Sequence, residues 1–275
     1  LNRYPEVMGL LNEIQPDILF IHDVQCLDIK VVVQFLKKHN ECIVYVDNHS
    51  DFSNSARNWL SKNLLHKILW RSMAKSIEPY VKLFYGVLPA RVDFLIDVYK
   101  LPADKCKLLV MGADDELIEK NAKQEVRSKT REKYGINAED FLVMTGGKID
   151  AFKIQTILLM EAIKEIEEKN VKLIVFGSVD ANLIDKVNEL ADGKKVQYIG
   201  WVEANDSYTL FSAADLVVFP GRHSVFWEQV VGQGIPLVVK YWEGTTHVNV
   251  CDNVKFLYKD SKEEIKAVIN EILQS

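Results

Sequence analysis

The chain has 275 residues, of which 48% are hydrophobic and 27% are charged, an ordinary composition for a globular protein. This length is sufficient for one large or two medium domains. The net charge of −5 argues against a general nucleic-acid binder, because affinity for phosphates requires a basic surface. No apolar run reaches the roughly 18 residues that a membrane-spanning helix needs.

The cysteines give an expectation about the compartment. Cys26, Cys42, Cys106 and Cys251 lie far apart and form no C-x-x-C pair. This pattern is typical of reduced thiols rather than of a disulfide framework, so we expect a cytoplasmic protein. The chain begins at Leu1 within a helical pattern. We therefore expect a fragment that lacks the start of its N-terminal domain.

Short apolar runs alternate with helical patterns along the first part of the chain. They predict strands at 18–21, 42–46, 83–87 and 105–110, and helices at 4–14, 29–39, 56–76 and 90–98. Such alternation favours a parallel sheet covered by helices.

Two successive predicted strands end in polar residues. His22 and Asp23 follow the first strand, and the run from Asp47 to Asp51, which includes His49, follows the second. A single histidine at such a place is usually a hydrogen-bonded turn residue. Because the carboxyl ends of parallel strands lie side by side, the repeated pattern favours one shared cleft.

The predicted helix at 56–76 carries only positive formal charges, at Arg57, Lys62, Lys67, Arg71 and Lys75. Apolar residues including Trp59, Leu60 and Leu64 recur between them. A basic amphipathic helix in an acidic protein can bind an anionic membrane surface. The alternative is a core helix whose basic face is solvated.

The second part of the chain repeats the alternating pattern after residues 116–133, which are densely charged and are interpreted as a linker. The predicted domains are residues 1–120 and 121–275. Strands are expected at 141–145, 172–176, 197–199, 216–219, 235–239 and 254–258, and helices at 154–169, 182–190, 207–213 and 261–273. The predicted fold class is α/β with two parallel-sheet units.

Glycines and lysines follow the first strand of the second unit. Gly146 and Gly147 precede Lys148, and Lys153 stands at the start of the next helix. Glycines let a backbone approach a ligand closely, and the lysines supply positive potential for phosphates. Gly177 has a similar place after the next strand. The pattern matches neither G-x-G-x-x-G nor the P-loop, so alone it indicates little.

The stretch 217–239 combines a strand, a polar turn, a short helix and another strand. His223, Ser224, Glu228 and Gln229 fall where the chain leaves the sheet, which is where α/β proteins bind ligands. The alternative is a solvated turn above a buried Trp227. No H-E-x-x-H motif or paired C-x-x-C occurs, so no metal site is expected.

Several segments together are similar to the retaining glycosyltransferases of the GT-B fold, in particular family 4 (glycosyl transferases group 1). The similar segments are KLLVMGAD (107–114), REKYGI (131–136), FLVMTGGKIDAFK (141–153), the strand 172–177, the run 198–202, LFSAADLVVFPG (210–221) and GQGIPLVV (232–239). The resemblance implies two Rossmann-like domains, the N-terminal one truncated here, and a nucleotide diphosphate sugar as donor. It also implies that Lys148 and Lys153 hold the donor diphosphate.

One stretch departs from the family. Family 4 usually carries two glutamates eight residues apart, which here correspond to Gly221 and Gln229. Glu228 or Gln229 could still bridge the ribose hydroxyls, because a carboxylate or amide can accept two hydrogen bonds. The block H-S-x-x-W-E-Q, which starts at His223, resembles capsular and surface-polysaccharide transferases.

The resemblance implies transfer of a hexose to a polysaccharide or lipid-linked acceptor, with no cofactor and no metal. Acceptor activation would then fall to His22, Asp23, His49 and Asp51, and donor binding to Gly147, Lys148, Lys153, Gly177, His223, Ser224, Glu228 and Gln229. Peripheral contact with the inner membrane face is expected from the basic amphipathic pattern of residues 56–76, and no nucleic-acid partner is expected. Two alternatives stay open, a nucleotide-sugar epimerase of the same fold and a non-catalytic sugar-nucleotide-binding protein.

Overall fold

The structure, a computed structural model, describes residues 3–151, 153–168 and 170–274. The chain divides into two compact units. The first comprises Leu1–Val110 and Glu243–His247, and the second comprises Met111–Trp242 and Val248–Ser275. The boundary expected after residue 120 falls inside helix α5 (Asp115–Asn121) of the second unit.

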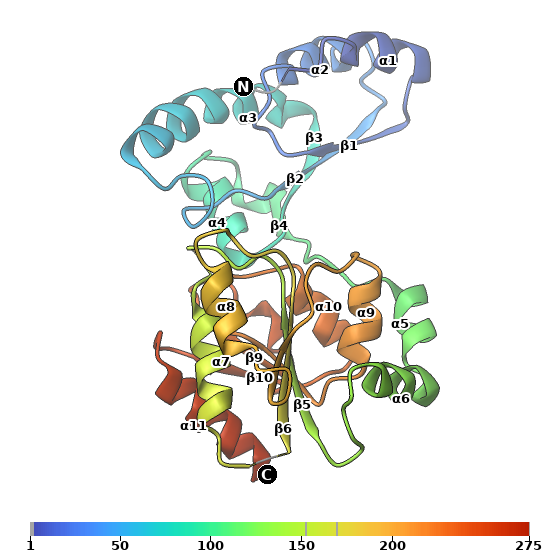
Figure 1. The fold of residues 1–275 in the computed structure, drawn as a ribbon. Coiled ribbons are helices and arrows are strands. Elements are labelled where there is room, and N and C mark those ends of the chain that lie inside the picture. Colours follow the sequence, from blue (N-terminus) through green and yellow to red (C-terminus); the bar gives the residue numbers. More distant parts are fainter. Residues whose placement is uncertain (1–2, 152, 169, 275) are drawn as a thin grey trace. The chain divides into compact units, whose positions relative to one another are not determined.

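The first unit contains a four-stranded parallel sheet in the order β1-β2-β3-β4 (Figure 1). Its strands are β1 (Ile18–His22), β2 (Ile43–Asn48), β3 (Val81–Gly86) and β4 (Cys106–Leu108). Its helices are α1 (Val7–Ile14), α2 (Ile29–Leu36), the π-helix η1 (Ser61–Trp70), α3 (Arg71–Ile77), the 3₁₀ turns η2 (Glu78–Tyr80) and η3 (Ala103–Lys105), and α4 (Pro89–Asp97). A hydrophobic core joins the sheet to α1, α2, η1, α3 and α4, which contribute buried apolar side chains to it.

The second unit contains a six-stranded parallel sheet in the order β10-β9-β8-β5-β6-β7. Its strands are β5 (Phe141–Gly146), β6 (Val171–Phe176), β7 (Val196–Tyr198), β8 (Leu216–Phe219), β9 (Leu237–Lys240) and β10 (Val254–Leu257). Its helices are α5, α6 (Gln124–Lys133), α7 (Gln155–Glu165), α8 (Ile184–Leu190), α9 (Asp206–Ser212), α10 (Phe226–Gly232) and α11 (Lys262–Leu273), and the 3₁₀ turn η4 (Thr246–Val248) follows β9.

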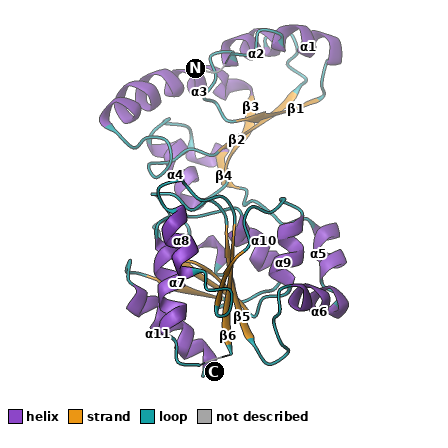
Figure 2. Ribbon diagram, viewed as in Figure 1, coloured by secondary structure: helices purple, strands orange, loops and turns teal. Residues whose placement is uncertain are grey.

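Helices cover both faces of this second sheet. Figure 1 shows α7, α8 and α11 on one side and α9 and α10 on the other, and Figure 2 shows how helices and strands alternate. Every residue of β8 and β9 is buried, as expected for central parallel strands. The predicted α/β class with two Rossmann-like parallel-sheet domains is therefore confirmed.

Residues 116–133, expected to form a linker, are helical instead. They form α5 and α6, and α6 packs against α9. Arg127 and Arg131 of α6 both pair with the Asp215 carboxylate just before β8. Polar contacts therefore hold α6 in place, which explains why apolar periodicity did not reveal this helix.

Two predicted helices differ in extent. The helix expected at 154–169 ends at Glu165, because Ile166 adopts an extended conformation and is buried in the core; its expected end at Lys169 lies outside the described residues. The helix expected at 56–76 is π-helical over Ser61–Trp70 and continues as α3. Over the described ranges, no helix has the length and apolar character needed to cross a bilayer.

Candidate functional site

The strand order of the second unit indicates where its sheet could bind a ligand. Strands β5, β6 and β7 follow one another in one direction from β5, whereas β8, β9 and β10 follow in the other. Strand order therefore reverses between β5 and β8, which pair directly. In open α/β sheets, ligands bind outside the carboxyl ends of strands at such a reversal. The loops after β5 and β8 are thus the first candidates for a binding site.

The glycines after β5 and β6 are required by close backbone contact. The Gly147 amide donates to the Phe176 carbonyl at 3.0 Å, and the φ angles of Gly147 and Gly177 are +112° and +119°. A Cβ on Gly177 would lie 1.9 Å from the Gly147 oxygen. The structure therefore brings the predicted residues Gly147 and Gly177 together, and only glycine fits at residue 177.

Replacing Gly177 by alanine is expected to destabilise the protein by about 3 kcal/mol or more, because the new methyl group would overlap backbone. Gly193 provides the matched control, since its φ is +69° but a Cβ there would meet nothing within 4 Å. Gly193→Ala should cost only about 1 kcal/mol. Urea denaturation of both variants measures the difference, and equal losses would show that the contact with Gly147 is unimportant.

Lys153 supplies a half-buried cation beside this glycine loop. Its Nζ lies 3.9 Å from the position that a Cβ on Gly147 would occupy. Burial lowers the pKa of Lys153, and the nearby Asp150 only partly opposes that shift. Among the described residues, no carboxylate lies within ion-pair distance of this ammonium. A half-buried ammonium without a paired carboxylate favours an anionic ligand.

Lys148 has a different environment. Its Nζ lies 3.3 Å from Asp150 Oδ2 and 3.4 Å from Asp180 Oδ1, and its side chain is 57% exposed. Hydrogen bonds to these two carboxylates raise the pKa of Lys148. Two neighbouring negative charges and solvent already compensate this cation. Lys148 and Lys153, which the sequence pattern does not distinguish, therefore have different environments.

The loop after β8 meets the loop after β5. A Cβ on Gly221 would lie 3.5 Å from Lys153 Cα and 3.3 Å from Gln155 Oε1. The Gln155 side chain thus stands where a larger side chain at residue 221 would project. Gln155 Oε1 is buried and has no hydrogen-bond partner among the described residues. Sequence reasoning missed Gln155, and no local signal could have revealed a contact between two distant loops.

His223 and Glu228 form a hydrogen-bonded pair at the start of α10. His223 Nε2 lies 2.8 Å from Glu228 Oε1, and both side chains are largely buried. The His223 ring packs edge-on against Trp227 at 5.0 Å between centroids. Ser224 is half-buried, and its carbonyl accepts from the Trp227 amide at 2.9 Å. These contacts fix the polar turn that the sequence singled out.

The side chain of Gln229 has a different partner from that of Glu228. Its amide exchanges hydrogen bonds with the Ser207 hydroxyl of α9, at 2.9 Å from Nε2 and 3.1 Å from Oε1. The side chain is buried. Gln229 therefore joins α10 to α9 in this structure, and its expected contact with a ribose stays a prediction.

A second polar cluster lies at the strand ends of the first unit. The parallel register places His22 opposite Asp47. His22 Nδ1 and His49 Nε2 lie 3.1 Å and 3.0 Å from the same oxygen, Asp47 Oδ2. Burial alone would raise the pKa of Asp47, but the two imidazoles and the Asp23 amide outweigh it and hold the pKa below its ordinary value.

Asp23 and a cavity complete this cluster. Asp23 has a φ of +68°, and burial raises the pKa of its carboxyl. A cavity of about 450 Å³ is lined by Tyr4, His22, Asp23, Gln25, Cys26, His49, Ser50, Asn54 and Ser55. Three of the four predicted catalytic residues, His22, Asp23 and His49, thus lie together. Asp47, which was not among the predicted candidates, is hydrogen-bonded to His22 and His49.

Asp51 does not belong to the group around the cavity. Its carboxylate accepts from Arg91 Nε at 3.1 Å and from the Asn54 amide at 3.2 Å. Burial would raise the pKa of Asp51, but Ser53 and Arg91 hold it below the ordinary value. These contacts indicate a structural role in the turn that follows β2.

Comparison with known proteins identifies the family. Residues 126–275, more than half of the chain, match the family model described as "Glycosyl transferases group 1". The chain belongs to this glycosyltransferase family. A curated relative, an uncharacterized glycosyltransferase of Methanocaldococcus jannaschii, is 26% identical over 147 residues. That match covers 52% of this chain and only 38% of the relative.

Solved structures share the fold of this family member. Anabaena HepE in complex with UDP has a TM-score of 0.72 at 18% identity, covering 98% of this chain and 71% of that one. A glycosyltransferase from Rickettsia africae has a TM-score of 0.70 at 12% identity, covering 100% and 74% of the two chains. At these identities the likeness concerns the fold alone, which is the two-domain GT-B type.

The first unit also contains a set of potential metal ligands. One ligand atom each from His22, Asp47 and His49 lies within 4.8 Å of the others. Two imidazoles and a carboxylate suit a divalent transition-metal ion. The same atoms are already hydrogen-bonded to one another. The expectation of chemistry without a metal stays a prediction.

Proposed function

We propose that this protein transfers a hexose from a nucleotide diphosphate sugar to a polysaccharide or lipid-linked acceptor, with retention of anomeric configuration. The observation that carries the proposal is the half-buried Lys153 ammonium beside the Gly147 backbone, where strand order reverses. Departure of a nucleoside diphosphate develops negative charge, which a fixed cation in a dry site stabilises strongly. No cofactor or metal is part of this proposal.

Contacts within the second unit support the proposed donor roles. Lys153 binds the diphosphate, and the more exposed Lys148 assists it. Gly147 and Gly177 let the backbone approach the nucleotide closely. We assign the contacts with the sugar and ribose to His223, Ser224, Glu228 and Gln229. Anabaena HepE was solved with UDP and glucose, which supports a uridine donor as the first to test.

The acceptor side is proposed for the first unit. His49 takes the proton of the acceptor hydroxyl, and Asp47 orients its imidazole, assisted by His22 and Asp23. A similar fold in WaaG, a glycosyltransferase involved in lipopolysaccharide biosynthesis, supports a surface glycan as acceptor. We place the reaction in the cytoplasm, at the inner face of a membrane that residues 56–76 contact.

A thermal-shift screen of the full-length protein tests donor binding. The panel contains UDP, ADP, GDP and CDP with their monophosphates and available sugar conjugates. One nucleoside diphosphate and its sugars should raise the Tm, and the monophosphate should raise it much less, because Lys153 needs the second phosphate. A protein that none of these nucleotides stabilises would contradict the proposed donor site.

A nucleotide-sugar epimerase is the second candidate. The UDP-GlcNAc 2-epimerase of Neisseria meningitidis has a TM-score of 0.62 to this chain at 11% identity. An epimerase acts on the donor alone, so turnover without any acceptor would distinguish it. The family match over residues 126–275 favours transfer.

A further inference from the structure

The carboxyl ends of β1 and β2 hold three potential metal ligands close together. His22 Nδ1 and His49 Nε2 lie 3.1 Å and 3.0 Å from the same atom, Asp47 Oδ2. All three ligand atoms lie within 4.8 Å of one another, and the two imidazole rings are 4.4 Å apart between centroids. Zinc–ligand bonds of about 2 Å place neighbouring ligand atoms of a tetrahedral ion about 3.3 Å apart. The contacts with the carboxylate therefore need to lengthen only slightly to admit a zinc ion.

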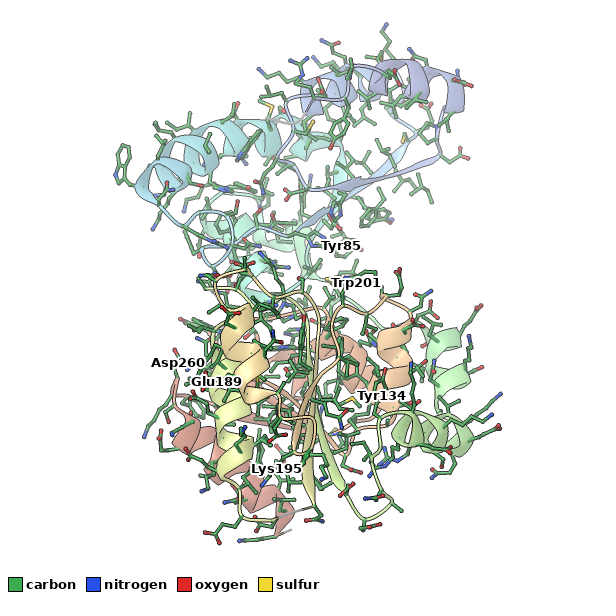
Figure 3. All side chains as sticks on the ribbon, viewed as in Figure 1. Tyr85, Tyr134, Glu189, Lys195, Trp201 and Asp260 are labelled. Carbon is green, nitrogen blue, oxygen red and sulfur yellow. The ribbon has the colours of Figure 1, made fainter. Side chains whose placement is uncertain are left out.

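The sheet holds the Asp47 carboxylate in a fixed orientation. The parallel register places Asp47 between His22 of β1 and Tyr85 of β3, which is labelled in Figure 3. Its other oxygen, Oδ1, accepts a hydrogen bond from the Asp23 amide at 3.1 Å. A ligating carboxylate is typically oriented by an outer hydrogen bond of this kind. Asp47 is therefore already oriented as a ligand by the backbone around it.

Solvent access and ligand type both favour zinc at this place. The His22 side chain is 73% exposed, and both His22 and His49 line the cavity of about 450 Å³. An ion bound here can enter from solvent and keep a water in its fourth position, as zinc does at sites with three protein ligands. Imidazole nitrogens suit zinc and its neighbours among the transition metals, whereas Mg²⁺ requires oxygen ligands.

We propose that His22, Asp47 and His49 bind a zinc ion that inhibits the proposed sugar transfer. Without the ion, His49 Nε2 carries the ring proton, because the Asp47 oxygen only accepts, and Nδ1 can act as the base. A zinc ion on Nε2 moves that proton to Nδ1, since a neutral imidazole carries one proton. His49 then cannot take the proton of the acceptor hydroxyl. Zinc binding stands on the geometry alone, whereas the inhibition rests on the proposed function.

Titration of the full chain with Co²⁺, after removal of bound metal by a chelator, tests the site without donor or acceptor. Four-coordinate Co²⁺ absorbs visible light much more strongly than hydrated Co²⁺, so its absorption reports the ligands directly. We expect a single equivalent of Co²⁺ to bind, Zn²⁺ to displace it and Mg²⁺ to leave it in place. His22→Ala and Asp47→Asn should each weaken binding about 100-fold or more, because loss of an outer partner alone costs about 10–100-fold.

His39→Ala is the matched control for the histidine variants. His39 also lies near a carboxylate, 3.5 Å from Glu41 Oε1, but within the described part of the chain it belongs to no group of three ligands. This variant should bind Co²⁺ as the wild type does. Circular dichroism and the Tm of each variant verify that it is folded.

The inhibition is tested by adding zinc to the transfer reaction. An equimolar amount should lower the rate of the wild type and of His39→Ala about 10²-fold or more, as expected for the loss of a general base, and excess EDTA should restore it. Nucleotide binding, measured by calorimetry, should be unchanged, because the proposed donor contacts lie in the second unit.

Several outcomes would overturn the proposal. A wild type without the cobalt absorption, or equal absorption in His22→Ala and Asp47→Asn, would contradict the site. A signal that is lost in His223→Ala instead would assign the ion to the second unit. Zinc that binds at this site but leaves the transfer rate unchanged would contradict the inhibition. If the metal-free protein transferred no sugar, the proposed function would fail, and the cobalt titration would still decide whether the site exists.

Discussion

Lys153→Met is expected to lower kcat for sugar transfer about 10²–10³-fold, the usual effect of removing one fixed charge that stabilises a transition state. Its ammonium is half-buried next to the glycine loop, and among the described residues no carboxylate pairs with it. Donor affinity should fall as well, because the same charge contacts the diphosphate in the ground state. Steady-state kinetics with the true donor, together with calorimetry, separate the two effects.

Lys148→Met is the matched control. Lys148 is mostly exposed and lies between Asp150 and Asp180, so its net contribution is expected to be about tenfold or less. Equal effects of the two substitutions, or a larger effect at Lys148, would contradict the assignment of the main phosphate contact to Lys153.

The pKa of Lys153 gives this prediction a pH dependence. Because burial lowers the pKa below the ordinary 10.5, the side chain loses its proton at a lower pH than other lysines do. Donor affinity should therefore be full below that pKa and should decline as the pH rises through it. Lys153→Arg keeps its charge across this range, so the decline should disappear in that variant. A decline of the same size in the arginine variant would assign it to another group.

His49→Ala is expected to lower kcat about 10²–10⁴-fold and to leave the Kd for the donor unchanged. The imidazole is held by Asp47 and lines the cavity of the first unit, whereas the proposed donor contacts lie in the second. Kinetics at saturating donor and calorimetry of donor binding provide the two readouts.

Two further variants serve as comparisons for His49→Ala. His39→Ala alters a histidine that stacks on Phe35 outside the cavity, and kcat should stay near that of the wild type. Asp51→Asn should lower the Tm more than kcat, because Asp51 holds Arg91 and the turn after β2. A loss of kcat at Asp51 as large as that at His49, with an unchanged Tm, would restore Asp51 to the catalytic group.

Much of the fold could be predicted because buried parallel strands are read as continuous apolar runs. The runs at 18–21, 141–145 and 216–219 all correspond to strands of the structure. Helix α6 could not be predicted in this way, because Arg127 and Arg131 hold it through Asp215 rather than through an apolar face. Charged contacts between segments distant in sequence have no periodicity that a local pattern can detect.

The candidate site was predictable where it depends on strand ends. His22 and His49 meet because their strands are neighbours, and Gly147 meets Gly177 for the same reason. The choice of Asp47 over Asp51 depends on register and on the turn after β2, which the sequence leaves open. The difference between Lys148 and Lys153 depends on burial, which is a property of the folded unit.

Product formation from radiolabelled UDP-glucose and UDP-N-acetylglucosamine, with and without a detergent-solubilised bacterial lipid extract as acceptor, tests the proposed transfer most directly. We expect labelled sugar to enter the lipid fraction with an equal amount of UDP released, at the same rate in the presence of EDTA. Formation of an epimerised nucleotide sugar in the absence of the extract would contradict glycosyl transfer. Donor binding without release of UDP, with or without the extract, would contradict it as well.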